Sequence, residues 1–480
     1  MFSIIALTVF LVGMVIVGFW GMKKTTTLGD FFLGGRSIGP WMSAFAYGTT
    51  YFSAVLFIGF AGSIGWGFGL KGLWIAFGNA IGGSLLAWLV RGRRTRRMTQ
   101  NLDVMTMPEF LQERFQGRYL KMIAAIIIFV FLTPYSASVF KGLGHLFEAN
   151  FHIPYDMALL IMIGITGIYL ILGGYFAVTL TDFIQGLIMI VGAIVMVLLL
   201  VAKGGGWTNV VNTIPQNYLA HFPAAQQPSM WLLAALVFMT SFGTWGMPQM
   251  VQKFYAIKDE KMIYKAAVVT TLFAIVIAFS AYFTGAMSHI FYTPETKPAV
   301  DQLIPDLLTK HLPEPVMVVI LLLVLSASMS TLASLVLVSA SAIAIDLYKG
   351  HVNPKVSKEN SLVMMRFLSG VFIAISFFIA RYKFEVIVTL MSISWGAVAG
   401  AFMAPFVYGL YWKRTTLLGA KAGMFVGLIL SVWLYFKLGS KLSPIAASIA
   451  ILVPFIVVPL VSVLTRPPQQ KIIDKAFDKI

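Results

Sequence analysis

Long apolar stretches recur along the whole chain, and they constrain its fold more than any other feature. Each stretch is about 20 residues long, enough for a helix to cross the roughly 30 Å hydrocarbon core of a bilayer. Backbone groups inside lipid need partners within their own segment, which also selects helices. Only 11% of the 480 residues are charged, whereas a soluble domain carries roughly 25%. We therefore predict an all-α protein that crosses a membrane many times.

Thirteen spans are predicted, with approximate limits at 3–21, 41–66, 70–90, 119–146, 157–173, 182–202, 229–249, 265–291, 315–345, 362–380, 385–409, 417–437 and 443–465. The first lacks a basic segment before it, so we expect a retained helix and not a signal peptide. Residues 1–480 would then form one transmembrane domain. We divide it into an extra N-terminal helix at 3–21, a first five-helix repeat at 41–202, a second repeat at 229–409, and two extra helices at 417–465.

The net charge of +17 is concentrated in short loops that all fall on one side under this span count. By the positive-inside rule that side is the cytoplasm of a plasma or bacterial inner membrane. The odd number of spans then places the N-terminus outside and the C-terminus in the cytoplasm. The basic segments are Lys23–Lys24, Arg91–Arg97, Lys253–Lys265, Lys349–Lys358, Lys413–Arg414 and the tail from Arg466. The chain has no cysteine, which excludes disulfides and thiolate chemistry.

Two of the spans carry residues that interrupt helices. Span 41–66 contains the cluster Gly48–Tyr51 and then Gly59, Gly62 and Gly65, whereas span 229–249 ends with Gly243, Gly246 and Pro248. These spans occupy matching positions in the two predicted repeats, and broken helices at such positions point to a binding site between the repeats. We predict that span 41–66 unwinds at the Gly48–Tyr51 cluster. Close helix packing is the alternative for any single glycine.

A cation site is predicted where the unwound span faces span 315–345. That span carries the adjacent hydroxyls of Ser330 and Thr331, and an unwound partner would free carbonyls such as those of Thr49 and Phe52. Hydroxyl and carbonyl oxygens suit hard cations. No ionisable residue is predicted at mid-membrane depth in spans 41–66, 229–249, 315–345 or 385–409, which favours sodium over protons. Bonding of each hydroxyl back to its own helix is the alternative.

The acid nearest to these spans is Asp182, at the predicted start of span 182–202. A carboxylate at such a position commonly caps the helix by accepting from its first amide groups. The alternative is a part in releasing the cation toward the cytoplasm.

At these residues the sequence resembles the sodium:solute symporter family, especially its bacterial sodium/proline and sodium/pantothenate branch. The resemblance covers nearly the whole chain and rests on several motifs taken together. These motifs are DFFLGGRSIGPW at Asp30–Trp41, FIGFAG at Phe57–Gly62, GGYFAVTLTDFIQG at Gly173–Gly186, ASMSTLASLVLVSASAI at Ala327–Ile343 with DLYK after it, and GLYWKR at Gly409–Arg414.

The resemblance implies a leucine-transporter-type fold, an inverted five-plus-five repeat with flanking helices. It also implies one principal sodium site, whose ligands would be the carbonyls of Thr49, Phe52 and Ala327 and the hydroxyls of Ser330 and Thr331. Some relatives bind a second sodium ion or release it along a path that Asp182 and Ser334 match here. Ala333 stands where those relatives have a further hydroxyl, so the pattern for a second ion is incomplete.

The resemblance also implies a solute pocket between the spans that start at 41, 119, 229 and 385. Its candidate residues are Tyr51, Ser53, Tyr135, Thr240, Thr244, Trp245, Ser392 and Trp395. Aromatic rings would form apolar walls and the hydroxyls would orient the solute. Members that carry proline have an acid at the position of Tyr51 and a tryptophan at that of Thr240, whereas Thr49–Ala54 is nearer to the pantothenate pattern.

We therefore predict a sodium-coupled secondary active symporter that imports a small organic solute by alternating access. The solute is expected to be an amino acid, a carboxylate or a pantothenate-like molecule, and a sugar is an alternative. A proton-coupled symporter of the same fold is the other alternative. We expect no enzyme activity, no nucleic acid and no obligate protein partner, because no catalytic group or soluble domain is visible in the sequence.

Overall fold

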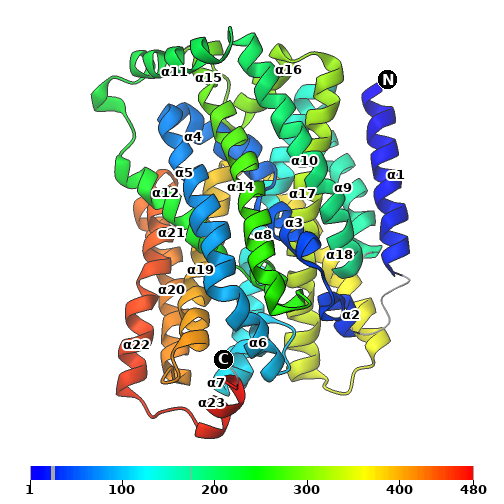
Figure 1. Cartoon of the computed structure of the whole chain (residues 1–480), viewed down its shortest axis with the longest axis vertical. Coiled ribbons are helices and arrows are strands. Elements are labelled where there is room, and N and C mark those ends of the chain that lie inside the picture. The colour runs from blue at the N-terminus through cyan, green and yellow to red at the C-terminus, as the bar shows by residue number, and fades with distance from the viewer. Residues whose placement is uncertain (1, 23–27, 173–174, 479–480) are drawn as a thin grey trace.

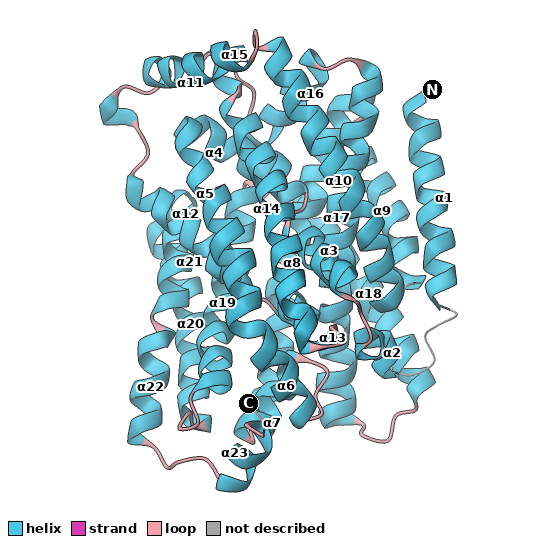
Figure 2. Cartoon of the chain, viewed as in Figure 1, coloured by secondary structure: helices cyan, strands magenta, loops and turns pink. Residues whose placement is uncertain are grey.

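The computed structural model describes residues 2–22, 28–172 and 175–478, and throughout these ranges the regular structure is helical (Figures 1 and 2). Lys23, Lys24 and the first two residues of the Gly173–Gly186 motif lie outside the described residues. Most of the long helices run along the long axis of the molecule (Figure 1). The all-α prediction is therefore confirmed.

The helices follow the apolar pattern of the sequence. Those that carry most of the predicted spans are α1 Phe2–Met22, α3 Pro40–Tyr51, α4 Ala61–Phe68, α5 Leu73–Gly78, α8 Arg118–Phe151, α9 Tyr155–Leu172, α10 Tyr175–Lys203, α12 Met230–Phe242, α13 Pro248–Ala256, α14 Ile263–Ala286, α17 Glu314–Ser341, α18 Lys358–Tyr382, α19 Ile387–Tyr411, α20 Leu417–Leu438, α21 Ser443–Leu452 and α22 Pro454–Leu464. Shorter helices connect them: α2 Leu28–Leu33, α6 Arg93–Asn101, α7 Met107–Phe115, α11 Trp207–His221, α15 Ser288–Phe291, α16 Leu303–His311 and α23 Gln470–Ala476. A wider π-type turn at Val55–Phe60 leads into α4, and similar turns at Asn79–Gly92 and Ala342–Val352 continue α5 and α17.

Every predicted span coincides with one helix or with a broken helix, but the count of thirteen stays a prediction. By length and hydropathy, nine helices of the described ranges are able to cross a membrane, or ten if a bent pair counts as one span. Two apolar stretches are shorter, Ile4–Val17 in α1 and Tyr155–Gly164 in α9. The described chain begins and ends at opposite ends of the molecule (Figure 1), as an odd number of crossings requires.

Three of the segments predicted to share one side do lie together. Glu260 accepts hydrogen bonds from Arg93 at 2.9 Å and Arg97 at 2.7 Å, which joins two of the basic segments. Asn101 donates to the backbone carbonyl of Asp478 at 2.9 Å, so the C-terminal segment joins the same end. At the other end, Asn217 in α11 donates to the carbonyl of His289 at 2.8 Å. These contacts fit the predicted sidedness of the loops.

Both helices that were predicted to be interrupted are broken. The first leaves helical geometry at Phe52–Ser53, between α3 and the turn that leads into α4. The second bends by 43° between Met230–Trp245 and Pro248–Ala256. Met247 has an extended backbone there, and Pro248 opens α13. Proline suits the first helical turn because its missing amide has no helical partner there.

The glycines of the first broken helix serve close packing. A side chain on Gly65 would lie 2.0 Å from the backbone of Gly285 in α14, so the two helices touch through their main chains. Gly48 faces the ring of Phe273 and Gly59 faces Ile387. Gly48–Tyr51 is itself helical, so the prediction of unwinding within this cluster is wrong by one residue. Small residues at such contacts let membrane helices approach closely.

Candidate sodium and solute site

The break after α3 releases backbone oxygens from the helical ladder. Phe52 has an extended backbone with φ −109° and ψ 114°. The amide of Ala54 donates to the Ser328 hydroxyl at 3.2 Å, and the amide of Val55 donates to Ser53 Oγ at 3.2 Å. In a continuous helix these amides would bond to carbonyls four residues earlier. The carbonyls of Thr50 and Tyr51 are therefore available to other partners.

Oxygens of α3 and α17 converge at this break. The Thr331 hydroxyl lies 3.1 Å from each of three carbonyl oxygens, those of Thr49, Thr50 and Ala327. The Ser330 hydroxyl donates to Thr49 Oγ1 at 2.7 Å. The side chains of all five of these residues are fully buried or nearly so. We call Thr49, Thr50, Ala327, Ser330 and Thr331 the oxygen cluster. Its donor set of neutral oxygens is the kind that holds a hard monovalent cation.

Four of the five predicted sodium ligands thus meet in space, Thr49, Ala327, Ser330 and Thr331. Phe52, the fifth, lies at the break itself, and its ring stacks on that of Tyr51 at 4.3 Å between centroids. The carbonyl of Thr50 joins the set and was not predicted.

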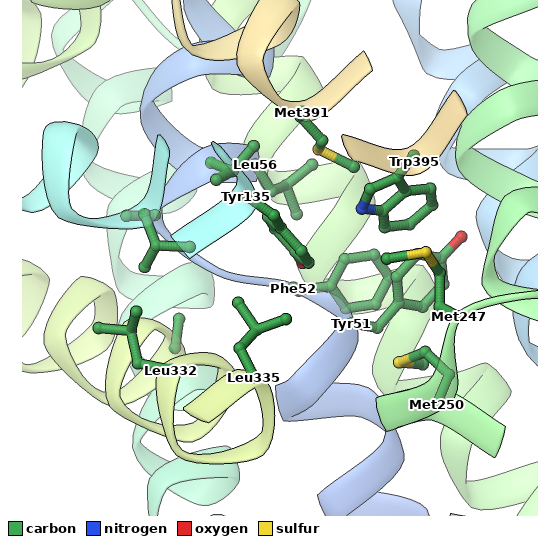
Figure 3. Packing of buried hydrophobic residues seen from close by; sticks show 14 of the residues in the cluster. Tyr51, Phe52, Leu56, Tyr135, Met247, Met250, Leu332, Leu335, Met391 and Trp395 are labelled. Carbon is green, nitrogen blue, oxygen red and sulfur yellow. The ribbon is translucent and has the colours of Figure 1, made fainter. Parts of the chain in front are cut away.

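A cavity beside the break is lined mainly by aromatic and apolar side chains (Figure 3). The room inside it for the centre of a water molecule is only about 20 Å³, so side chains nearly fill the cavity in this structure. Four predicted solute residues line it: Tyr51, Ser53, Tyr135 and Thr240. The Tyr51 hydroxyl donates to the carbonyl of Thr240 at 2.6 Å, which ties the two broken helices together. No charged side chain lines the cavity in the part of the chain that the structure describes.

The other predicted solute residues lie off this cavity. The hydroxyls of Thr244 and Ser392 donate to carbonyls of their own helices, at Ser241 and Val388. The indole of Trp245 donates to Gly82 O at 3.0 Å, and the Arg91 guanidinium lies 4.8 Å from its ring. Trp395 packs against two lining residues: its ring centroid lies 6.3 Å from that of Tyr51 and 5.9 Å from that of Tyr135 (Figure 3).

Several lining residues were not predicted: Val55, Leu56, Phe60, Asn79, Tyr282 and Met391. Asn79 is the most informative, because its side-chain oxygen accepts from Thr240 at 2.9 Å and from Ser241 at 3.3 Å. A lone asparagine at the centre of the apolar span 70–90 was the signal that could have found it.

Two interpretations of the ionisable residues were wrong. Asp182 does not cap its helix, because α10 already begins at Tyr175 and Asp182 is fully buried inside it. Lys253 is not a loop residue, because α13 continues to Ala256, beyond the predicted limit of 249, and buries the lysine to 1% exposure. Its ammonium lies 3.8 Å from Asp182 Oδ2. An ion pair therefore lies next to a site that was predicted to have no charge.

A sequence profile of the sodium:solute symporter family matches residues 31–427. The chain belongs to this family. The symporter is 31% identical to the sodium/proline symporter of Haemophilus influenzae over 99% of this chain and 97% of that protein. It is also 30% identical to the high-affinity proline transporter PutP of Bacillus subtilis, over 97% and 98% of the two chains.

Solved structures identify the fold. The symporter matches a Na⁺-coupled sialic acid symporter with a TM-score of 0.80 and 19% identity, over 98% of this chain and 99% of the other. It matches the nucleobase-cation-symport-1 family transporter Mhp1 with a TM-score of 0.55 and 13% identity, over 94% and 99%. The fold is therefore of the leucine-transporter type, and the chain is a membrane transporter that couples a solute to sodium, not an enzyme.

Arg36 joins three segments at the end of the symporter that carries the basic loops. Its guanidinium donates to the carbonyls of Val104 at 2.7 Å, Thr99 at 3.3 Å and Tyr255 at 3.4 Å. Burial lowers the pKa of this guanidinium, and the neighbouring Tyr255 and Asp103 oppose that shift. The contacts join the segment before α3 to α6 and to the end of α13. A small cavity lined by Tyr255 and Ser341 lies next to these contacts.

A buried ion pair closes the opposite end. Lys141 of α8 lies 2.6 Å from Asp301, and both side chains are about 5% exposed. The Lys141 ammonium also donates to the carbonyl of Glu385 at 2.9 Å, and Asp301 accepts from the amide of Ile387 at 3.3 Å. The pair therefore fastens α8 and the loop before α16 to the start of α19.

Proposed function

We propose that this symporter imports a small zwitterionic amino acid together with sodium, which binds at the oxygen cluster. Thr49, Phe52, Ala327, Ser330 and Thr331 are the proposed sodium ligands. The observation that carries the proposal is the break at Phe52–Ser53, opposite Ser330 and Thr331. One end of that break offers backbone oxygens to the ion, and the other faces the solute cavity.

The lining of the cavity supports a solute without net charge. Among the described residues it contains no Asp, Glu, Lys or Arg that could neutralise a charged solute. A zwitterion finds complementary partners at a broken helix, since a carboxylate is stabilised by the N-terminus of one half and an ammonium by the carbonyls of the other. The aromatic walls suit an apolar body, and Asn79, Ser53 and Thr240 offer hydrogen bonds.

Sodium would connect the two sites mechanically. By drawing the α3 carbonyls toward the α17 hydroxyls, the ion fixes the position of Tyr51 and Ser53 at the wall of the cavity. Solute affinity then rises when sodium is bound, and by linkage sodium affinity rises when solute is bound. Transport would proceed by alternating access in a plasma or bacterial inner membrane. Repeats at 41–202 and 229–409, with the N-terminus outside and the C-terminus in the cytoplasm, are part of the proposal.

Sodium-driven uptake of radiolabelled zwitterionic amino acids into proteoliposomes tests the proposal. L-proline is one of them because the named relatives are proline transporters, but Tyr51 and Thr240 depart from the proline-carrying pattern, so the test does not depend on proline alone. We expect saturable uptake that stops when choline replaces sodium at fixed pH. A panel of zwitterionic amino acids should compete, whereas anionic carboxylates and sugars should not. Competition by a sugar or a dicarboxylate alone would overturn the assignment of the solute.

A proton-coupled symporter of the same fold is the second candidate. The buried pair of Asp182 and Lys253 favours it, because titratable groups at membrane depth commonly serve proton transport. Uptake driven by a pH gradient in the absence of sodium decides between the two. We expect none.

A further inference from the structure

A lysine of the second broken helix reaches into the space next to the oxygen cluster. The ammonium of Lys253 donates to the Ser334 hydroxyl at 3.1 Å and lies 3.8 Å from Asp182 Oδ2. It also lies 5.2 Å from the centre of the Tyr175 ring. A hydroxyl, a carboxylate and an aromatic face thus surround it, and an ammonium has three donors to place. Lys253, Asp182 and Ser334 are almost completely buried.

This group continues directly into the oxygen cluster. The Ser334 hydroxyl lies 3.0 Å from the hydroxyl of Thr50, whose own carbonyl is 3.1 Å from Thr331. Ser334 stands one turn beyond Ser330 on α17, so the same helix face serves both groups. The lysine therefore holds α13 of the second broken helix to α10 and α17, and Ser334 continues the contact to Thr50 of α3.

A carboxylate and hydroxyls one turn from a sodium site would by themselves attract a second sodium ion. Asp182 and Ser334 provide those oxygens, and among the described residues neither carboxylate oxygen of Asp182 has a hydrogen-bond partner. A carboxylate that is ionised while buried requires a counter-ion. Lys253 already supplies one positive charge, so a sodium ion in the same place would bring two cations to one carboxylate.

We propose that the Lys253 ammonium permanently fills the position of a second sodium ion, so that the symporter binds one sodium ion per cycle. This inference rests on the proposed sodium site and adds its stoichiometry. Lys253 thus determines how many sodium ions bind, because its ammonium group, which is part of the protein, excludes a second sodium ion. Because the lysine side chain is part of the protein, its positive charge is not transported across the membrane.

Removing the lysine should restore the second site. In Lys253→Met the Asp182 carboxylate loses its counter-ion, while the hydroxyls of Ser334 and Thr50 remain beside it. Sodium is then the cation best able to replace the ammonium. In the double variant Lys253→Met/Asp182→Asn the carboxylate charge is gone as well, and with it the attraction for a second ion.

The test counts sodium ions bound to the purified full-length protein by equilibrium binding of ²²Na⁺, with choline maintaining the ionic strength. We expect one ion per molecule for the unsubstituted protein, two for Lys253→Met and one for the double variant. Lys121→Met is the matched control, because Lys121 pairs with the buried Asp346 at 3.4 Å away from the oxygen cluster. It should bind one ion.

The outcomes separate this inference from the proposed function. Two sodium ions bound to the unsubstituted protein would overturn the inference. This measurement does not depend on whether any variant folds. One ion or none on a Lys253→Met protein that remains monodisperse also overturns it. No sodium binding to the unsubstituted protein would instead remove the proposed sodium site itself.

Discussion

At the scale of single residues, the Thr331 hydroxyl is the point where the two helices of the sodium site meet. It lies 3.1 Å from carbonyls of both α3 and α17. In Thr331→Ala these carbonyls lose a shared partner and the ion loses a ligand. We expect the sodium concentration for half-maximal uptake to rise at least tenfold, which corresponds to about 1.4 kcal/mol. Thr331→Ser, which keeps the oxygen, should stay within a few-fold of the unsubstituted protein.

The control for this variant is a hydroxyl with only a local role. Ser376 on α18 donates to the carbonyl of Phe372 in its own helix at 2.8 Å, a common arrangement in membrane helices. Ser376→Ala should leave the sodium dependence of uptake unchanged. If Thr331→Ala behaves like Ser376→Ala, Thr331 is not a sodium ligand.

Residues adjacent in sequence were the ones that could be predicted. Ser330 and Thr331 stand together in an apolar span, so their meeting with a broken partner followed from the pattern alone. Asn79 and Tyr282 reach the cavity from helices whose rotation only packing decides. Lys253 was wrongly predicted to lie in a loop, because a lysine just beyond the predicted end of a span is usually exposed to solvent. Its burial depends on Asp182, distant in sequence.

At the scale of helices, α4 and α14 make the closest main-chain approach of the first broken span. A side chain on Gly285 would lie 2.0 Å from the carbonyl oxygen of Ala61. No rotamer change relieves a contact with backbone, so the helices must separate. We expect Gly285→Ala to reduce stability by about 1–3 kcal/mol, measured by thermal unfolding in detergent, and to slow transport.

Gly370 on α18 is the matched glycine, because a side chain there would meet nothing within 4 Å. In Gly370→Ala the higher helix propensity of alanine should raise stability by about 0.5–1 kcal/mol. Equal effects of the two substitutions would show that helix propensity, and not the contact of α4 with α14, governs both.

The helices themselves were more predictable than their breaks. Each stretch that hydropathy predicted as a span is a helix or a broken helix in the described residues, because lipid allows little choice of backbone structure. The break of the first span comes at Phe52–Ser53, which are neither glycine nor proline. It is stabilised by partners distant in sequence, since Ser328 of α17 accepts the amide of Ala54. Such tertiary partners leave no mark in the local sequence.

At the scale of the whole molecule, Arg36 holds the end of the protein that we assign to the cytoplasm closed. Its contacts with Val104 and Tyr255 are lost in Arg36→Ala. We expect the cavity behind it to open more often, so that a cysteine introduced at Ser341 reacts several-fold faster with N-ethylmaleimide. The absence of natural cysteines makes this readout specific.

An arginine outside the closure provides the comparison. Arg93 is 70% exposed and pairs with Glu260, so Arg93→Ala should leave the reaction rate of the Ser341→Cys protein unchanged. An unchanged rate in Arg36→Ala as well would mean that other contacts keep this end closed.

The charge carried through the molecule in one cycle follows from the sites taken together. In the proposed cycle, one sodium ion bound by neutral oxygens and a zwitterionic solute would move one net positive charge, since Lys253 stays with the protein. A potential of 100 mV, negative inside, then contributes about 2.3 kcal/mol to accumulation, or about 50-fold in the concentration ratio. We expect a potassium gradient with valinomycin to increase sodium-driven uptake of the amino acid accordingly. Uptake that ignores this potential would require a compensating charge to move, and the tethered lysine would be the first group to examine.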